Sequence, residues 1–443
     1  MRYIPHTGDD KRAMLQALGY ASVDELFDDI PRTARLERLL NLPSALSELE
    51  LQQHMAELAG KNHSVDDLVS FLGGGFYDRF IPAAIAQLAE RGEFLTAYTP
   101  YQAELSQGTL AGIFEFQTMI AGLCGMYAAQ ASMYDGSSAV GEAALLALGQ
   151  TEPGHLVVSR YLHPDSISVV RTYAHARRAQ VSVVDSAEDL EKVLSTQKTS
   201  GVIWQYPDIM GSFKSLPDAI MLAHRFGALA IVSSDPVALS VLKPPGEWGA
   251  DIVVGEGQPL GNHLNYGGPT LGFFAVTEQL VRKLPGRLVG QSYDREGRRG
   301  FVLTLQAREQ HIRRERATSN ICSNHSLNAL QATIYMALLG PSGMKEVARL
   351  SISKAHYLAQ ALAQAGFVRV NADDPFLYEF VVKVPGSVAS LNRHLLSKNI
   401  IGGLDMGQWD PAFSGMWQIA VTEKRSRAQL DQLVEEAKRW MSR

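Results

Sequence analysis

The sequence predicts an α/β fold in which helices cover both faces of a mostly parallel sheet. Six short apolar runs are typical of strands, and they lie at 155–160, 180–185, 201–206, 228–234, 251–256 and 271–276. Amphipathic stretches at 166–178 and 216–227 fall between them and predict helices. Strands that alternate with helices pair in parallel through right-handed crossovers, and ligands of such sheets bind at the loops leaving the carboxyl ends of the strands. We therefore look for function in those loops.

We divide the chain of 443 residues into three parts, because this length suits two or three domains. Residues 1–63 predict a helical N-terminal arm, in which Ser22 with Glu25, and Ser47 with Glu50, have the spacing of capping boxes. Such an arm has to pack its apolar stripe on its own core or on a partner subunit. Residues 64–346 predict the large α/β domain, and residues 347–443 predict a small α+β domain.

Composition and charge argue against several classes of protein. The chain is 46% hydrophobic and 20% charged, and no apolar run reaches the roughly 20 residues of a membrane span. A net charge of -5 disfavours general binding to nucleic acid. The first thirty residues carry charges throughout and do not resemble a signal peptide, so we expect a cytoplasmic protein. Cys124 and Cys322 stand alone and predict buried thiols, with no metal site.

One loop has the features of an anion site. Residues 132–138, which include Ser132, Ser137 and Ser138, immediately precede an Ala/Leu-rich helix. Free backbone N–H groups and hydroxyls at the start of a helix suit a phosphate. Ordinary helix capping by Asp135 or Ser137 explains the same pattern equally well.

Two further residues stand at the ends of predicted strands. His163 follows the run at 155–160, where it is either a hydrogen-bonded structural histidine or a site residue. Asp235 ends the run at 228–234, where its carboxylate suits either a protonated ring nitrogen or a cap of the next turn.

The loop after 251–256 contains Gly255, Gly257 and Gly261 but no lysine, the nearest being Lys243 and Lys283. The glycine spacing and the turn-like residues that follow disfavour a dinucleotide-binding fingerprint, which needs a helix at that point.

A further feature is the basic segment at 308–316, whose arginines would spread around much of the circumference of a helix. It contains Arg308, Arg313, Arg314 and Arg316, with Glu309 and Glu315 among them. This mixture is typical of a solvated face with ion pairs, although one or two arginines remain available for a carboxylate or phosphate. The acidic balance of the chain and the lack of a binding module disfavour a nucleic-acid interface.

In order along the chain, these loops resemble those of the fold-type I pyridoxal-phosphate enzymes. Longer motifs at 1–7, 97–120, 131–139, 243–261, 267–275 and 298–324 are similar to the alpha subunit, or subunit 1, of the two-chain P-protein family of the glycine cleavage system. The resemblance covers essentially the whole chain.

The resemblance implies that a lysine is missing here. Aligning the family's lysine loop on Gly267, Gly268 and Pro269 brings the lysine to Gln258, and a second register gives Pro259. A carboxamide cannot form a Schiff base because its nitrogen is not nucleophilic. The chain therefore resembles the alpha subunit and not the beta subunit that carries the cofactor.

The resemblance also implies partners and a reaction. The alpha chain pairs with the beta subunit, two of each forming a tetramer, and pyridoxal phosphate is held by the beta chain at their boundary. Glycine is decarboxylated there, with the cofactor as electron sink, and the aminomethyl group passes to the lipoyl arm of the H-protein. The loops around Ser137, His163 and Asp235 are then expected to be vestigial, with no cofactor bound covalently to this chain.

The loop at 97–108 is the segment that we expect this chain to lend to the site of its partner. Tyr98 and Tyr101 flank Pro100, and we predict that both tyrosines approach the cofactor or glycine held by the beta subunit. A structural turn with buried tyrosines is the alternative. At the level of the whole chain, the alternatives are a non-catalytic scaffold or regulatory subunit and a self-sufficient enzyme that uses Lys243 or Lys283.

Overall fold

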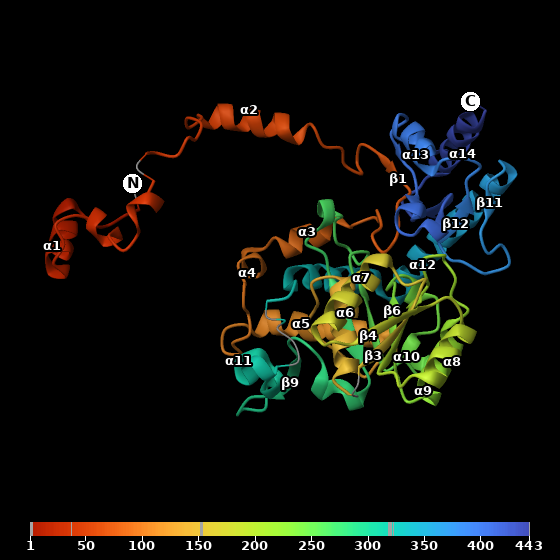
Figure 1. Ribbon diagram of the computed structural model, residues 1–443, viewed down its shortest axis with the longest axis horizontal. Helices are drawn as coiled ribbons and strands as arrows, with labels where there is room; N and C mark the ends of the chain where they lie inside the picture. The colour runs from red at the N-terminus through yellow and green to blue at the C-terminus, as the bar shows by residue number, and fades with distance from the viewer. Residues whose placement is uncertain (1–2, 37, 151–153, 318–320, 322, 443) are drawn as a thin grey trace. The chain divides into compact units, whose positions relative to one another are not determined.

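The computed structural model describes residues 3–36, 38–150, 154–317, 321 and 323–442, and its contacts divide the chain into two units between His63 and Ser64 (Figure 1). The division of the second unit at residue 346, expected from the sequence, stays a prediction.

The first unit contains two helices, α1 (Gly8–Leu18) and α2 (Glu48–Ala59). The capping box predicted at Ser47 is confirmed, since Ser47 Oγ accepts from Glu50 N–H and the Glu50 carboxylate accepts from Ser47 N–H at 2.8 Å. The box predicted at Ser22 is wrong. A 3-10 helix (Asp24–Phe27) forms there without a side-chain cap, and the Glu25 carboxylate accepts from Ala21 N–H instead. Neither α1 nor α2 buries a residue, and the packing of the arm on a partner stays a prediction.

The second unit is built on a seven-stranded sheet of order β2-β8-β7-β6-β5-β3-β4. All six predicted strands form. The five strands from β3 to β7 are parallel to one another, as expected. Strand β8 is antiparallel to β7, and the loop at 257–271, which contains a 3-10 helix (Asn265–Gly267) and no α-helix, joins the two. The strands are β2 (Ala128–Ala129), β3 (His155–Ser159), β4 (Gln180–Val184), β5 (Gly201–Tyr206), β6 (Leu229–Ser234), β7 (Ile252–Glu256) and β8 (Gly272–Val276).

Successive apolar side chains of these strands enter two different cores, because a strand has a side-chain period of two. On β5, Val202 and Trp204 enter one core and Ile203 the other, and Val253 on β7 is likewise separated from Ile252. Helices α6 (Gly136–Leu148) and α7 (Pro164–Ala176) pack in the second core. The first core is filled by α5 (Gln107–Cys124), α8 (Ala187–Thr196), α9 (Leu216–Arg225) and part of α12 (Ser326–Gln364) (Figure 1). Helices thus cover both faces, as predicted.

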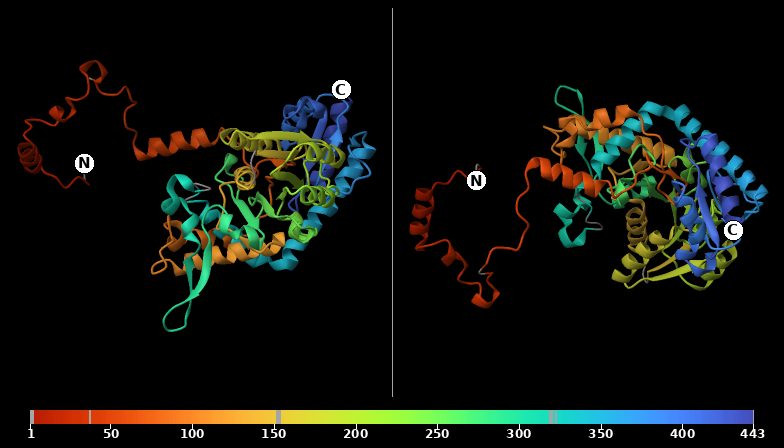
Figure 2. Two further views of the ribbon diagram at one scale, coloured as in Figure 1. Left: turned by 60° about the horizontal axis from the view of Figure 1, so that its bottom comes forward. Right: turned by 90° about the horizontal axis from the view of Figure 1, so that it is seen from above.

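The C-terminal region forms a separate antiparallel sheet of order β11-β12-β15-β14, which gathers at one side of the main sheet in both views of Figure 2. Its elements are β11 (Val368–Arg369), β12 (Glu379–Lys383), α13 (Val388–Leu396), β13 (Ile400–Ile401), β14 (Leu404–Asp405), β15 (Met416–Ala420) and α14 (Arg427–Met441). Helix α12 leads into this region. It breaks at Gly340, which has a φ of 61° and is followed by Pro341. A parallel pairing of β1 (Val69–Ser70) with β13 ties the start of the unit to its end.

A two-stranded hairpin packs against α5. Strands β9 (Val289–Tyr293) and β10 (Arg299–Leu303) form a hairpin that extends outward in Figure 2. The basic segment at 308–316 is divided into short helical pieces at Gln306–Arg308, Gln310–Arg313 and Arg314–Arg316, with Arg314 at a φ of 52°. Short helices α3 (Ala83–Ala89), α4 (Gly92–Leu95) and α10 (Pro245–Trp248) complete the unit.

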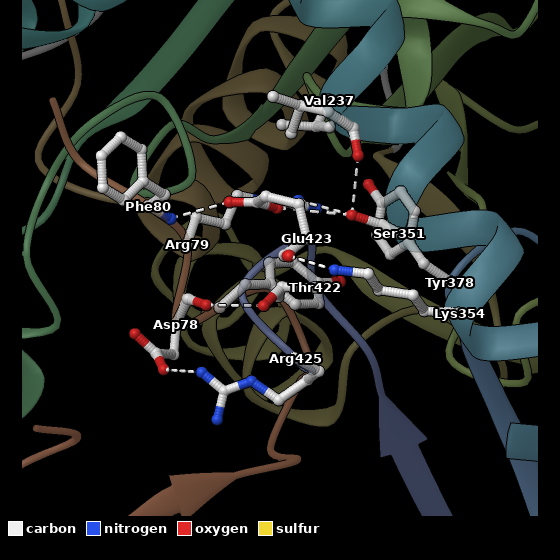
Figure 3. Close-up of polar contacts among 12 residues, drawn as sticks. Asp78, Arg79, Phe80, Val237, Ser351, Lys354, Tyr378, Thr422, Glu423 and Arg425 are labelled. Carbon is white, nitrogen blue, oxygen red and sulfur yellow. Dashed lines mark hydrogen bonds and ion pairs between the residues drawn. The ribbon is translucent and has the colours of Figure 1, made fainter. Parts of the chain in front are cut away.

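A buried charge cluster connects residues 78–80 to residues 422–425 (Figure 3). The Asp78 carboxylate is paired with Arg425 and with Lys424 at 2.6 Å, while Arg79 is paired with Glu423 at 2.8 Å. Thr422 Oγ1 donates to the Asp78 carbonyl at 2.8 Å. The side chains of Asp78 and Arg425 are only 6% and 4% exposed, so the charge of Arg425 depends on Asp78 for its compensation, while Asp78 is also paired with Lys424.

Replacing Asp78 by alanine should lower the free energy of unfolding by about 3–5 kcal/mol, because the buried Arg425 guanidinium loses its partner. Urea unfolding followed by circular dichroism measures this. The matched control is Glu191→Ala, which breaks an exposed pair with Arg225 and should cost no more than about 1 kcal/mol. If both variants lost the same free energy of unfolding, the buried pair of Asp78 and Arg425 would not have the stabilising role described.

Candidate functional site

A cavity of about 500 Å³ lies at the carboxyl ends of the parallel strands, the place predicted from the fold. His163 follows β3, Gln205 lies near the end of β5, Asp235 follows β6, and Glu256 is the last residue of β7. The start of α6 and residues from 74–77 and 377–379 close the cavity from other sides. The structure thus brings Ser137, His163 and Asp235 together, as the sequence predicted.

A carboxylate of the protein itself occupies the start of α6. Gly136 N–H donates to Glu256 Oε2 at 2.9 Å, and the same carboxylate accepts from the N–H groups of Gln258 at 2.9 Å and Leu271 at 3.2 Å. A Cβ at position 136 would lie 2.8 Å from Glu256 N, so glycine is required for this approach. Burial raises the pKa of Glu256 to about 7, although these three hydrogen bonds act in the opposite direction.

The other groups at the start of α6 act as caps. Asp135 accepts from Ser138 N–H at 2.7 Å and forms a capping box with that residue. The Ser137 hydroxyl lies 3.0 Å from that of Ser166. Ser132 is buried and does not line the cavity. Capping, which was one of the two interpretations of this loop, is confirmed for Asp135.

His163 lies in the cavity as the N-cap of α7. Its Nδ1 accepts from Asp165 N–H at 3.2 Å, and its ring meets that of Trp409 edge-on with centroids 5.1 Å apart. Burial lowers the pKa of His163, although the negative charge of Asp165 acts to raise it. The ring is therefore neutral near neutral pH. The structure gives this histidine a structural role, and its part in ring stacking stays a prediction.

Both carboxylate oxygens of Asp235 have partners. Oδ1 accepts from Val237 N–H at 2.8 Å and so caps the turn after β6, while Oδ2 accepts from the Tyr378 hydroxyl at 2.5 Å. The capping interpretation of Asp235 is therefore confirmed, and a ring nitrogen would have to displace Tyr378.

Gln258, at the position of the missing lysine, is buried and does not line the cavity. Its Nε2 donates to the carbonyls of Asn262 at 2.7 Å and Tyr77 at 3.2 Å, and its Oε1 accepts from Tyr77 N–H at 2.9 Å. Only a carboxamide both donates and accepts in this way. The side chain thus fixes the loop after β7 to residue 77.

The structure reveals site residues that the sequence did not single out. Glu379 accepts from Gly74 N–H at 2.6 Å and from the Tyr77 hydroxyl at 3.1 Å, and burial raises its pKa to about 7. The position of Glu256 at the end of a predicted strand was a signal that could have found it. Glu379 carried no such signal, because it reaches the cavity from a sheet formed by residues more than a hundred positions away.

Several predicted residues lie outside the cavity. Tyr98 is 78% exposed, whereas Tyr101 is partly buried, with its ring centroid 4.9 Å from the guanidinium carbon of Arg287. Lys243 lies over the ring of Trp248, and Lys283 contacts Gln150. Neither lysine reaches the cavity, so the interpretation as a self-sufficient enzyme is disfavoured.

The cysteines and arginines have structural surroundings. Cys124 is buried as expected, and burial raises the pKa of its thiol; Cys322 lies outside the described residues. Arg308 contacts the Leu284 carbonyl, and burial, together with the charge of Arg287, lowers the pKa of Arg308 to about 10. Arg313, Arg314 and Arg316 are exposed.

The sheet order, the C-terminal antiparallel sheet and the cavity define a protein of the fold-type I pyridoxal-phosphate-dependent class. A cysteine desulfurase from Thermococcus onnurineus has the same fold, with a TM-score of 0.64 at 13% identity over 87% of this chain and 98% of that one. The chain matches the family described as "Glycine cleavage system P-protein" over residues 1–437, and it belongs to that family.

Relatives of high identity carry a more specific name. The "Probable glycine dehydrogenase (decarboxylating) subunit 1" of Carboxydothermus hydrogenoformans is 50% identical over 440 residues, which is 98% of this chain and 99% of the relative. That of Desulforamulus reducens is 49% identical over 98% of both chains. A crystal structure of a glycine decarboxylase (P-protein) in inhibitor-bound form superimposes with a TM-score of 0.87 at 40% identity, covering 99% of this chain and all of that one.

The residues of this chain do not fit pyridoxal phosphate. The anion position at α6 is taken by Glu256, the lysine position is a hydrogen-bonded glutamine, and none of the described residues that line the cavity is Lys or Arg. A phosphate brought to Glu256 would meet a like charge, which costs binding free energy. We derive no chemical step from a cofactor in this cavity.

Neither a membrane span nor a metal cluster is found in the described part of the chain. Among those residues no helix combines the length and apolarity needed to cross a membrane, and the cytoplasmic location stays a prediction. No group of three or more His, Cys, Asp or Glu side chains there is arranged to hold a metal ion.

Glu379→Gln should change the pH dependence of stability. In the wild type the folded chain holds a proton on Glu379 up to about pH 7, while the unfolded chain releases it near pH 4.5, so the free energy of unfolding falls as pH rises through that window. The free energy of unfolding of the variant, taken relative to that of the wild type, should therefore be about 1–3 kcal/mol higher at pH 8 than at pH 5. Its amide oxygen still accepts from Gly74, and Tyr77 then becomes the acceptor.

Urea unfolding at a series of pH values measures this difference. Glu191→Gln, on the exposed face of α8, is the control and should show a difference from wild type that does not vary across the window. A constant difference for Glu379→Gln as well would show that burial does not raise the pKa of Glu379.

Restoring a lysine at residue 258 should not restore cofactor binding. Gln258→Lys leaves Tyr77 N–H without an acceptor and should lower the free energy of unfolding by about 1–3 kcal/mol. After incubation with pyridoxal phosphate and borohydride, peptide mass spectrometry should find no pyridoxyl group on residue 258. Gln291→Lys on exposed β9 is the control for stability. A pyridoxyl group on the introduced side chain would overturn the conclusion that the cavity does not fit the cofactor.

Proposed function

We propose that this chain is the alpha subunit of the two-chain P-protein of the glycine cleavage system. With a beta subunit it decarboxylates glycine and transfers the aminomethyl group to the lipoyl arm of the H-protein. The observation that carries the proposal is the combination of a family match over residues 1–437 with a cavity in which no described lining residue is lysine and Glu256 accepts from the start of α6. Such a chain needs a partner that supplies the cofactor site.

Pyridoxal phosphate, in this proposal, is held by the beta subunit. When bound, it supplies the electron sink for the carbanion that forms as glycine loses CO2. Two alpha and two beta chains assemble, and the H-protein reaches the site at their boundary. The poor fit of the cofactor to this chain supports the division of labour between the two subunits.

The loop between α4 and α5 is the part of this chain that we place at the partner's site. Pro100 is buried and anchors the turn, while Tyr98 and Leu105 are 78% and 80% exposed on either side of it. Large exposed side chains on a firmly anchored turn are typical of a contact surface. Tyr101 N–H donates to the Thr99 carbonyl at 2.9 Å, which keeps the turn tight.

The two tyrosines then have different parts. Tyr98 projects from the turn and approaches glycine or the cofactor of the beta subunit. Tyr101 is partly buried in a small core with Ile113 and Phe301 and lies against Arg287, so it positions the turn and reaches the partner less directly.

A scaffold or regulatory subunit is the second function that the structure favours, because the cavity of this chain lacks the cofactor's binding groups. The two functions differ in what the beta subunit does alone and with an altered alpha chain. A scaffold restores activity whatever residue stands at position 98, provided that the complex assembles.

Tyr98→Phe, assembled with wild-type beta subunit, should lower glycine–CO2 exchange roughly tenfold or more, because one hydrogen bond near the reacting groups is lost. Sizing should show an unchanged complex. Tyr127→Phe is the matched control, since Tyr127 is 63% exposed elsewhere on the unit, and its exchange rate should equal that of wild type. Full activity of both Tyr98→Phe and Tyr101→Phe would refute the lending of this loop and favour the scaffold.

A further inference from the structure

A segment with three successive glycines, residues 73–75, forms part of the cavity wall. Gly74, Gly75 and Phe76 line the cavity, and Phe76 is also 38% exposed, so the segment lies where the cavity meets solvent. Gly74 and Gly75 have φ angles of 76° and 101°, in the region that residues with a side chain rarely adopt. Glycine has more backbone freedom than any other residue, so the segment can change its conformation at little cost in strain.

The chain is fixed on both sides of this segment. Before it, Phe71 is buried, and its backbone N–H and carbonyl bond to the C-terminal region at 2.9 and 3.0 Å. After it, Tyr77 is buried, and the Gln258 side chain bonds to both its N–H and its carbonyl. Residues 73–76, which we call the glycine strap, thus lie between two fixed points.

One hydrogen bond holds the glycine strap in place. Gly74 N–H donates to Glu379 Oε1 at 2.6 Å, and in the described part of the chain it is the one hydrogen bond that residues 73–76 make. Glu379 belongs to β12 and also accepts from the Tyr77 hydroxyl at 3.1 Å, which fixes the position of its carboxylate. A Cβ at position 73 would overlap this carboxylate, so the strap approaches it only with glycine there.

We propose that the glycine strap is a movable cover at the cavity entrance, held closed by the hydrogen bond from Gly74 to Glu379 and open when that bond is broken. The anchors at Phe71 and Tyr77 confine the motion to the strap. A single hydrogen bond contributes far less free energy than unfolding of the whole unit requires, so the strap opens locally while the rest of the cavity wall stays folded. Access to the cavity is thereby set by this chain itself and does not depend on the partner proposed above.

The rate at which a reagent enters the cavity tests the proposal. Ser137→Cys places a thiol on the cavity wall, and its alkylation by iodoacetamide in the full chain is followed by peptide mass spectrometry, which reads this residue separately from the native cysteines. Glu379→Ala removes the acceptor of Gly74 N–H and should raise the alkylation rate about tenfold or more. Glu379→Gln keeps an oxygen for Gly74 N–H and should change the rate less than about twofold.

A second variant opens the strap without removing a side chain from the cavity wall. Gly75→Ala places a side chain at a φ of 101°, and no atom lies within 4 Å of the new Cβ, so its effect comes from the backbone. It should raise the alkylation rate about fivefold, because the closed conformation of the strap becomes strained. Gly366→Ala is the matched control, since Gly366 has a φ of 95° and equally open surroundings outside the cavity, and it should leave the rate unchanged.

A reference thiol separates access from general reactivity. Ser195→Cys lies on the exposed face of α8, and its alkylation rate should be the same in every background. Circular dichroism confirms folding, and Gly75→Ala carries the test if Glu379→Ala does not fold. Unchanged alkylation at residue 137 in the folded variants would refute the cover. A rise with Glu379→Gln as large as with Glu379→Ala would also overturn it, because the acceptor of Gly74 N–H would then not be what closes the strap.

Discussion

The hydrogen bonds between the Glu256 carboxylate and the start of α6 determine what the cavity can accept. In a parallel α/β sheet the amino end of a helix beside the strand ends is a natural anion site. Here Glu256 is the last residue of β7, and Gly136 allows the helix to approach it closely enough for a hydrogen bond of 2.9 Å. The anion site is therefore filled by the chain itself, and the cavity keeps a shape typical of its fold while its charge is reversed.

Gln258 extends this arrangement to the neighbouring loop. A lysine at this position would be flexible and charged, whereas the glutamine is fixed by donating and accepting hydrogen bonds at residues 77 and 262. Residue 77 in turn contacts Glu379, and residues 78 and 79 are paired with the C-terminal region. Contacts within the chain thus occupy the lysine position, and the charge cluster in Figure 3 joins residues 78–80 to residues 422–425.

The cavity and the surface loop at Tyr98 then suit different purposes. The cavity is acidic and enclosed by groups of this chain, while the loop presents exposed side chains on a buried proline anchor. An alpha subunit that contributes to a partner's site uses its surface and not its own cavity.

The sequence by itself indicated an α/β fold with a mostly parallel sheet, because the apolar runs alternate with amphipathic stretches. The order of the strands came only from the structure, in which β5 pairs with β3 and not with its predecessor β4. The sequence also located His163, Asp235 and Ser137 at one edge, since the carboxyl ends of parallel strands meet there. Local charge patterns did not reveal how the segment at 308–316 is divided, since a break such as the one at Arg314 leaves no trace in them.

Only the tertiary structure decided the chemistry of the cavity. The partners of Asp235 and Gln258 are Tyr378 and Tyr77, and Glu379 comes from the C-terminal sheet, so these contacts join residues more than a hundred positions apart. Contacts of this kind leave no periodic trace in the sequence. Whether a carboxylate binds a ligand, caps a turn or fills an anion site depends on what the fold brings within hydrogen-bonding distance.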